Sequence, residues 1–236
     1  MYCFVLNRSD FKEVDQIVTL YSWEKGKIQA LARGIKKITS KNSAFLEPVF
    51  LLEADIIPGK ELDHLTKAVP LYCYKNILNN LEKLVLVRIV FSWLATLTEA
   101  GQRDSKIFLL VKSWLEFLNE TQLPTSALAY SFLANLIDCL GFLPNLVQCA
   151  FCDDKKDLIS FYPAAASVVC KNCFLIKKQA VNDIYPIRSV DLQAIKFLFS
   201  KQWTDILNHN TEIANRLVFL YAQYHSERKL AKLKFI

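Results

Sequence analysis

Glycine and proline are scarce in this sequence, which has 5 Gly and 7 Pro among its 236 residues. Flexible linkers and low-complexity segments are usually rich in these residues, so their scarcity argues against both. The phosphate-binding loop G-x-x-x-x-G-K-[ST] is also excluded. Gly59 and Lys60 are followed by Glu61, and Ala54 stands where the first glycine of that loop would be.

No apolar run is long enough to suggest a membrane span. The strongest run, residues 84–97, is interrupted by Arg88, and the next, residues 127–144, carries Asn135 and Asp138. A bilayer requires about 20 consecutive apolar residues, so both runs are expected to be buried helices. The N-terminus has no basic lead-in followed by an apolar core, so no signal peptide is expected. These features predict a cytoplasmic protein with no membrane partner.

Histidine is scarce as well, and none of the 3 His lies in a motif with a nucleophile or a metal-binding partner. The sequence also lacks the G-x-S-x-G elbow of hydrolases and the H-x-E…P-C-x-x-C pattern of deaminases. We therefore expect no catalytic residues, no small-molecule substrate and no enzymatic activity.

Cysteine is the abundant reactive residue, and four of the 7 Cys form two C-x-x-C pairs. Cys149 and Cys152 form the first pair, Cys170 and Cys173 the second, and 17 residues separate Cys152 from Cys170. This spacing is typical of a four-cysteine zinc site, in which each tight knuckle aims two sulfurs at one tetrahedral ion. The alternative is a redox pair or chance pairing.

Four thiolates fill the coordination shell of zinc and leave no position for an activated water. The sequence therefore predicts one structural zinc ion as cofactor. The other three cysteines stand alone in apolar surroundings and are expected to be ordinary buried thiols.

The pattern of the chain changes near residue 80, which predicts an α+β fold. Residues 2–8, 16–22, 27–33 and 45–57 read as strands with intervening turns, as in a small barrel or sandwich. Helical patterns follow, with Thr125 and Ser126 as candidate N-caps and Gly141 as a helix stop; the helical segments are residues 77–101, 107–118, 127–140, 190–199 and 213–234.

Positive charge is concentrated at the two ends of the chain. Residues 1–41 contain eight basic and four acidic side chains, and residues 216–236 contain five basic and one acidic. Such a distribution is typical of a polyanion-binding protein. The candidate nucleic-acid contacts are Lys25, Lys27, Arg33, Lys36, Lys37, Lys41, Arg228 and Lys229.

The basic segment 33–41 follows a predicted strand and contains Gly34, which gives a loop that can follow a phosphate backbone. Tyr21 and Trp23 lie nearby in sequence and are candidate platforms for base stacking. The alternative is an ordinary solvated loop, because lysines are common on any surface.

The order of these motifs resembles the RecO family of recombination mediators. The N-terminal resemblance runs through residues 5–6, 13–15, 18–20, 26–27 and 32–37, and the later part through residues 141–152, the second C-x-x-C and residues 224–230. The resemblance implies an OB-fold over residues 1–80 and a helical domain over residues 81–236. It also implies a zinc module inserted within the helical domain at residues 145–178.

Two departures from that family pattern affect the zinc module. Asp153 stands where many members have glycine, and residues 164–166 are alanines where a glycine pair is expected. Both departures would stiffen or reshape the turns around the zinc ligands.

The resemblance also implies a function in DNA repair and homologous recombination. Members of the RecO family bind single- and double-stranded DNA and anneal complementary strands without ATP. With RecR they help to load RecA onto DNA coated by single-strand-binding protein. The alternative that the residues leave open is a zinc-ribbon adaptor for RNA or for the transcription machinery, because stacking platforms and basic grooves are not selective.

Overall fold

The computed structural model describes residues 1–37, 40, 43–200, 202–206 and 211–233. The chain forms two compact units: Met1–Pro124 together with Leu230–Ile236, and Thr125–Lys229. No helix within the described ranges combines the length and the apolarity needed to cross a membrane.

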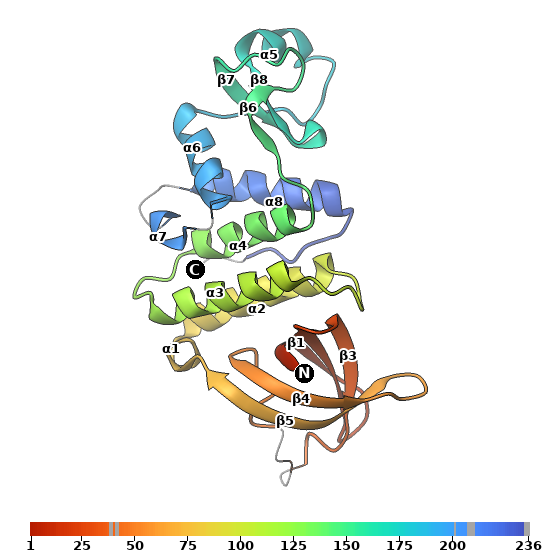
Figure 1. Cartoon of the computed structure of the whole chain (residues 1–236). Coiled ribbons are helices and arrows are strands. Elements are labelled where there is room, and N and C mark those ends of the chain that lie inside the picture. The colour runs from red at the N-terminus through yellow and green to blue at the C-terminus, as the bar shows by residue number, and fades with distance from the viewer. Residues whose placement is uncertain (38–39, 41–42, 201, 207–210, 234–236) are drawn as a thin grey trace. The chain divides into compact units, whose positions relative to one another are not determined.

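The first unit begins with a closed five-stranded barrel (Figure 1). Around the barrel the strands are ordered β1-β2-β3-β5-β4, and β4 pairs with β1 to close it. β3 and β5 pair in parallel, and the other neighbours are antiparallel. This arrangement confirms the predicted OB-fold. The strands are β1 (Tyr2–Asp10), β2 (Gln16–Ser22), β3 (Gly26–Ala32), β4 (Phe50–Ile57) and β5 (Asp63–Cys73).

Alternating apolar residues fill the barrel, as expected for strands with one buried face. Val18 and Leu20 of β2, Ile28 and Ala30 of β3, and Leu52 of β4 belong to one buried cluster. β2, β3 and β4 therefore contribute alternate side chains to the core.

Three helices follow the barrel in the same unit: α1 (Lys75–Leu78), α2 (Leu81–Leu97) and α3 (Ser105–Glu120). The side chain of Asn80 caps α2 by accepting a hydrogen bond from the Lys83 N–H, and Asp104 caps α3 in the same way. Lys83 is buried, and its ammonium donates to the carbonyl oxygen of Asn119 at 2.9 Å, which joins the two helices.

The β2–β3 turn packs directly against the α2–α3 loop. Gly26 has a φ of +67°, and a Cβ added there would lie 1.9 Å from the carbonyl oxygen of Gln102. Gly101 N–H donates to the Lys27 carbonyl oxygen at 2.9 Å. Glycine is thus required at position 26 both for its backbone angle and for the close approach.

The second unit contains α4 (Ser126–Cys139), α6 (Ser189–Leu198), α7 (Trp203–Ile206) and α8 (Glu212–Ser226). The Ser131 hydroxyl and the Asn135 amide, both buried in α4, donate to the carbonyl oxygen of Leu198 at 2.8 and 3.1 Å. These bonds satisfy an orphan carbonyl at the end of α6.

A small sheet and two short helices interrupt these helices between α4 and α6. The sheet is ordered β6-β8-β7-β9. Its strands are β6 (Asn145–Cys149), β7 (Leu158–Tyr162), β8 (Ser167–Cys170) and β9 (Tyr185–Pro186); the short helices are η1 (Pro163–Ala165) and α5 (Lys171–Lys177). The described elements therefore confirm the predicted helical region with an inserted cysteine-bearing segment.

The helix predicted over residues 213–234 is too long. It ends at Ser226, because Glu227 adopts a left-handed conformation with a φ of +52°. The strand predicted over residues 45–57 begins only at Phe50, and β5 was not predicted. The domain boundaries at residues 80 and 81 stay a prediction; α2 and α3 belong to the same compact unit as the barrel.

Candidate metal centre and nucleic-acid interface

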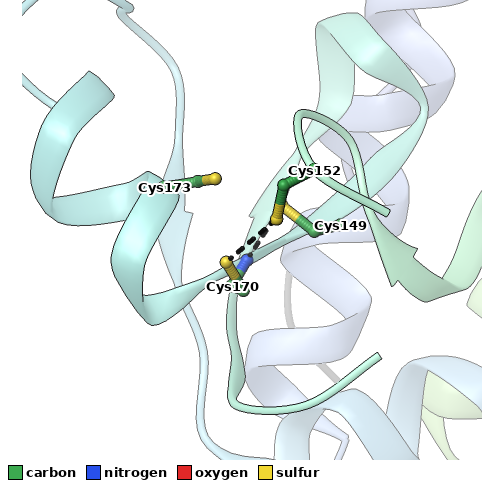
Figure 2. Close-up of side chains that lie close together, drawn as sticks. All are labelled: Cys149, Cys152, Cys170 and Cys173. Atoms are coloured by element: carbon green, nitrogen blue, oxygen red, sulfur yellow. Dashed lines mark hydrogen bonds between the residues drawn. The ribbon is translucent and has the colours of Figure 1, made fainter. Parts of the chain in front are cut away.

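Four cysteine sulfurs meet at one point of the small sheet. Cys149 and Cys170 end β6 and β8, Cys152 lies in the turn after β6, and Cys173 lies in α5. Their Sγ atoms all lie within 4.8 Å of one another. Figure 2 shows the four side chains converging from these separate segments.

The distances suit a tetrahedral metal site. A zinc–sulfur bond of about 2.3 Å in a tetrahedron places neighbouring sulfurs about 3.8 Å apart. The Sγ atoms of Cys152 and Cys170 are 3.7 Å apart, and all four cysteines are free of disulfides. The two predicted C-x-x-C pairs are therefore brought together as one four-thiol cluster.

The surroundings favour a thiolate at Cys149. Burial raises the pKa of this thiol, but N–H groups of Cys170, Phe151 and Cys152 donate to its sulfur and outweigh burial, so its pKa falls to about 7. The Cys170 N–H lies 3.3 Å from that sulfur. Burial and the neighbouring cysteines raise the pKa of Cys173. A divalent cation at the centre would relieve the repulsion between four thiolates.

The departures from the family pattern fall where the backbone is left-handed. Asp153 has a φ of +58° and Ala166 a φ of +50°, a region that glycine adopts without strain. Asp153 N–H nevertheless donates to the Cys149 carbonyl oxygen at 3.1 Å, which completes the first knuckle. The turns keep the knuckle shape at a cost of about 1–3 kcal/mol for each strained residue.

Residues 33–37, called the basic turn below, follow β3 at one end of the barrel. Gly34 has a φ of +62°, and its N–H donates to the Asp15 carboxylate at 2.7 Å. Lys36 N–H donates to the Val14 carbonyl oxygen at 3.1 Å. The basic turn is thereby fixed against the β1–β2 loop.

The basic turn presents its charges to solvent. Arg33 and Lys37 are exposed and form no ion pair within the described part of the chain. The ammonium of Lys36 lies 2.6 Å from a carboxylate oxygen of Asp10. Exposed pairs of this kind contribute about 0–1 kcal/mol, so the Lys36 side chain can exchange Asp10 for another anion.

One of the other predicted contacts, Lys25, lies away from the basic turn. Lys25 is exposed but lies in the β2–β3 turn, at the opposite end of a strand of 7 residues. At about 3.3 Å per residue, roughly 20 Å separates the two turns. Arg228 and Lys229 follow α8 in the second unit, and Lys41 lies outside the described residues.

Tyr21 was wrongly predicted as a stacking platform. Its side chain is fully buried, and its hydroxyl donates to the Asp104 carbonyl oxygen at 3.4 Å. Trp23 is half-buried: its ring packs edge-on against Phe108, with the Arg103 guanidinium 5.7 Å from the ring centroid. The aromatic residues of this turn attach the barrel to α3.

Lys27 has a structural function that its sequence context did not reveal. Its ammonium donates to the carbonyl oxygen of Ala95 at 2.7 Å and also to that of Thr98, at the C-terminal end of α2. A cation at this position satisfies orphan carbonyls and opposes the negative end of the helix dipole. The proposed DNA surface is therefore built on the basic turn without Lys27.

We expect Lys27→Met to lower the free energy of unfolding of the first unit by about 1.5–3 kcal/mol, because hydrogen bonds from a charged donor are lost. The measurement is urea denaturation followed by tryptophan fluorescence. Lys25→Met is the matched control, since Lys25 is exposed in the adjacent turn. Equal stability of the Lys27 variant and the control would show that the two carbonyl contacts contribute nothing.

Two family sequence models match the chain along nearly its whole length. The family described as "Recombination protein O N terminal" matches residues 1–74, and "Recombination protein O C terminal" matches residues 78–234. The boundary between the matches falls within α1, directly after the barrel.

Curated relatives agree with these matches. A protein from a Thermoanaerobacter species, named DNA repair protein RecO, is 24% identical over 237 residues, covering 98% of this chain and 94% of the relative. Its namesake from Pelotomaculum thermopropionicum is 26% identical over 238 residues, covering 98% and 91%. Another, from Desulfitobacterium hafniense, is 30% identical over 171 residues, covering 72% and 62%.

Proposed function

The chain belongs to the RecO family of DNA repair proteins, and from that premise we propose that it binds single- and double-stranded DNA. We further propose that it anneals complementary strands without ATP. The observation that carries this proposal is the basic turn, an exposed set of cationic side chains fixed at one end of an OB-type barrel. OB-folds commonly bind nucleic acid through such loops.

The chemistry of annealing demands little from the protein. Duplex formation is downhill by a mean of about 1.4 kcal/mol per base-pair step, so neither nucleotide hydrolysis nor a catalytic residue is needed. The obstacle is the repulsion between two phosphate backbones and the entropy lost when the strands meet. The repulsion would be reduced because Arg33, Lys36 and Lys37 neutralise phosphates. The entropy loss would be reduced because the same side chains hold one strand in place.

The proposed partners follow from the family. They are RecR, single-strand-binding protein and, through these, RecA, in the cytoplasm. The four-cysteine cluster is proposed to hold one structural zinc ion, with Cys149, Cys152, Cys170 and Cys173 as ligands. The ion would stabilise the inserted module, and its filled coordination shell would leave no place for a reacting water.

The proposal is tested by the rate of duplex formation between labelled complementary strands coated with single-strand-binding protein. We expect the purified protein to accelerate annealing equally with and without ATP, and the rate to fall as salt rises. A strict ATP requirement, or no acceleration over the protein-free reaction at low salt, would contradict the proposed function.

A further inference from the structure

Residues 145–178, which carry the four clustered cysteines, are called the cysteine module below. Its exposed aromatic residue is Phe151, which lies between Cys149 and Cys152. Phe151 is 40% exposed and lies in a polar turn. The Asp153 N–H donates to the Cys149 carbonyl oxygen at 3.1 Å, which closes the turn that carries the ring. A rigid support of this kind holds the ring at the surface.

Two side chains frame the Phe151 ring. Tyr162, at the end of β7, stacks beside it with 6.0 Å between ring centroids and an interplanar angle of 22°. The ammonium of Lys177 in α5 lies 5.7 Å from the Phe151 centroid, within the range of a cation–π contact. A lysine is flexible enough to leave the ring and to contact an anion nearby.

Both signs of charge lie near this ring, with Asp153, Asp154 and Asp157 after it in the chain and lysines in and after α5. Residues 171–180 include Lys171, Lys177 and Lys178, all exposed, and no acidic residue. Lys177 and Lys178 form no ion pair within the described part of the chain, so both are able to contact an anion. A flat apolar ring beside unneutralised lysines is the combination that binds single-stranded nucleic acid.

We propose that Phe151 is a stacking platform for one base of single-stranded DNA, with Lys177 and Lys178 against the adjacent phosphates. This inference rests on the proposed function and adds a second DNA contact, carried by the cysteine module. The stacked base takes the place of the Lys177 ammonium over the ring, and the displaced ammonium moves to the phosphate of the same nucleotide. The contact is sequence-tolerant because every base has a π-face.

The test compares Phe151→Ala with Phe142→Ala, a matched control that removes another phenylalanine of the same unit with 42% exposure. Binding to fluorescent oligo-dT is measured by anisotropy, and the metal content of each variant by elemental analysis. We expect Phe151→Ala to bind at least about fivefold more weakly, from the lower end of base–aromatic stacking energies, and Phe142→Ala to bind as the wild type does. Phe151→Trp should restore binding.

A second measurement, made on the wild-type protein, applies if the Phe151→Ala variant loses its metal. Oligonucleotides with 5-iodouracil are photo-crosslinked to the wild-type protein, and the adduct is mapped by mass spectrometry, with Phe151 as the expected position. Unchanged affinity of a metal-loaded Phe151→Ala variant, or adducts confined to the barrel, would overturn the inference. In that case the exposed Leu175 and Ile176 of α5 would favour a protein partner at this surface of the module. Wild-type protein that fails to bind oligo-dT would instead refute the proposed function.

Discussion

Replacing Cys170 by serine is expected to abolish zinc binding and to unfold the four-cysteine module. Serine keeps the size of the side chain but removes a thiolate that zinc requires. Binding of zinc to small structural sites is worth about 10–16 kcal/mol, comparable to the stability of a whole domain. We expect this substitution to have a larger effect on stability than any other substitution proposed for this chain.

We expect the module to depend on a bound metal because its own core is small. Its buried apolar cluster consists of Cys149, Val169 and Cys170, with a few partly buried neighbours. So few side chains cannot offset the conformational entropy lost on ordering the segment. Cys149 and Cys170 of that buried cluster also belong to the four-cysteine set, so Cys170→Ser would remove a proposed metal ligand and part of the cluster together.

The experiment measures zinc by elemental analysis and amide hydrogen exchange across residues 145–178. In wild-type protein we expect one zinc per chain and slow exchange in β7 and β8. In Cys170→Ser we expect no zinc and fast exchange in those strands, with the barrel unchanged. Cys139→Ser is the matched control, because Cys139 lies outside the four-cysteine cluster. Unchanged zinc content in Cys170→Ser would refute the assignment of the ligands.

The elements that could be predicted from the sequence are those determined by local spacing. The two C-x-x-C pairs require only that short turns aim sulfurs inward, and the structure brings all four together. β2 was predicted with its observed bounds because Trp23 and Gly26 mark the turn that follows it. The end of α8 was missed because it depends on the left-handed conformation of Glu227, a residue without the usual preference for that region.

The nucleic-acid contacts were harder to predict because charge alone does not reveal tertiary partners. Lys27 and Lys36 look alike in sequence, yet Lys27 bonds to the end of α2 and Lys36 remains at the surface. Tyr21 was misassigned for the same reason, since its burial depends on α3, more than eighty residues later in the chain. Only the folded structure of the barrel shows which cations support the fold and which face solvent.

Charge reversal of the basic turn, Lys36→Glu with Lys37→Glu, is expected to weaken binding to single-stranded DNA by more than tenfold at low salt. Each lysine that neutralises a phosphate contributes about 0.7 to the slope of log affinity against log salt concentration, so the slope should fall by about 1.4. All sequences should be affected alike, because phosphate contacts carry no base information. Folding should survive, because both side chains are exposed.

Lys75→Glu with Lys106→Glu is the matched control for this variant. It changes the net charge equally, and both lysines are exposed in the same unit but lie in α1 and α3, away from the basic turn in sequence. We expect the control pair to bind DNA nearly as the wild type does. Equal losses in the two variants would mean that binding follows net charge alone and that the basic turn is not a site.

The central claim, that this chain binds single-stranded DNA through the basic turn of its barrel, is tested most directly by a salt titration of affinity. Wild-type protein, the basic-turn variant and the control pair are titrated with a labelled oligonucleotide at several salt concentrations, with hairpin RNA as competitor. We expect a shallower slope for the basic-turn variant alone and a clear preference for DNA over the hairpin. Identical slopes for all three proteins, or tighter binding to the hairpin RNA, would contradict this claim and favour an RNA-binding adaptor.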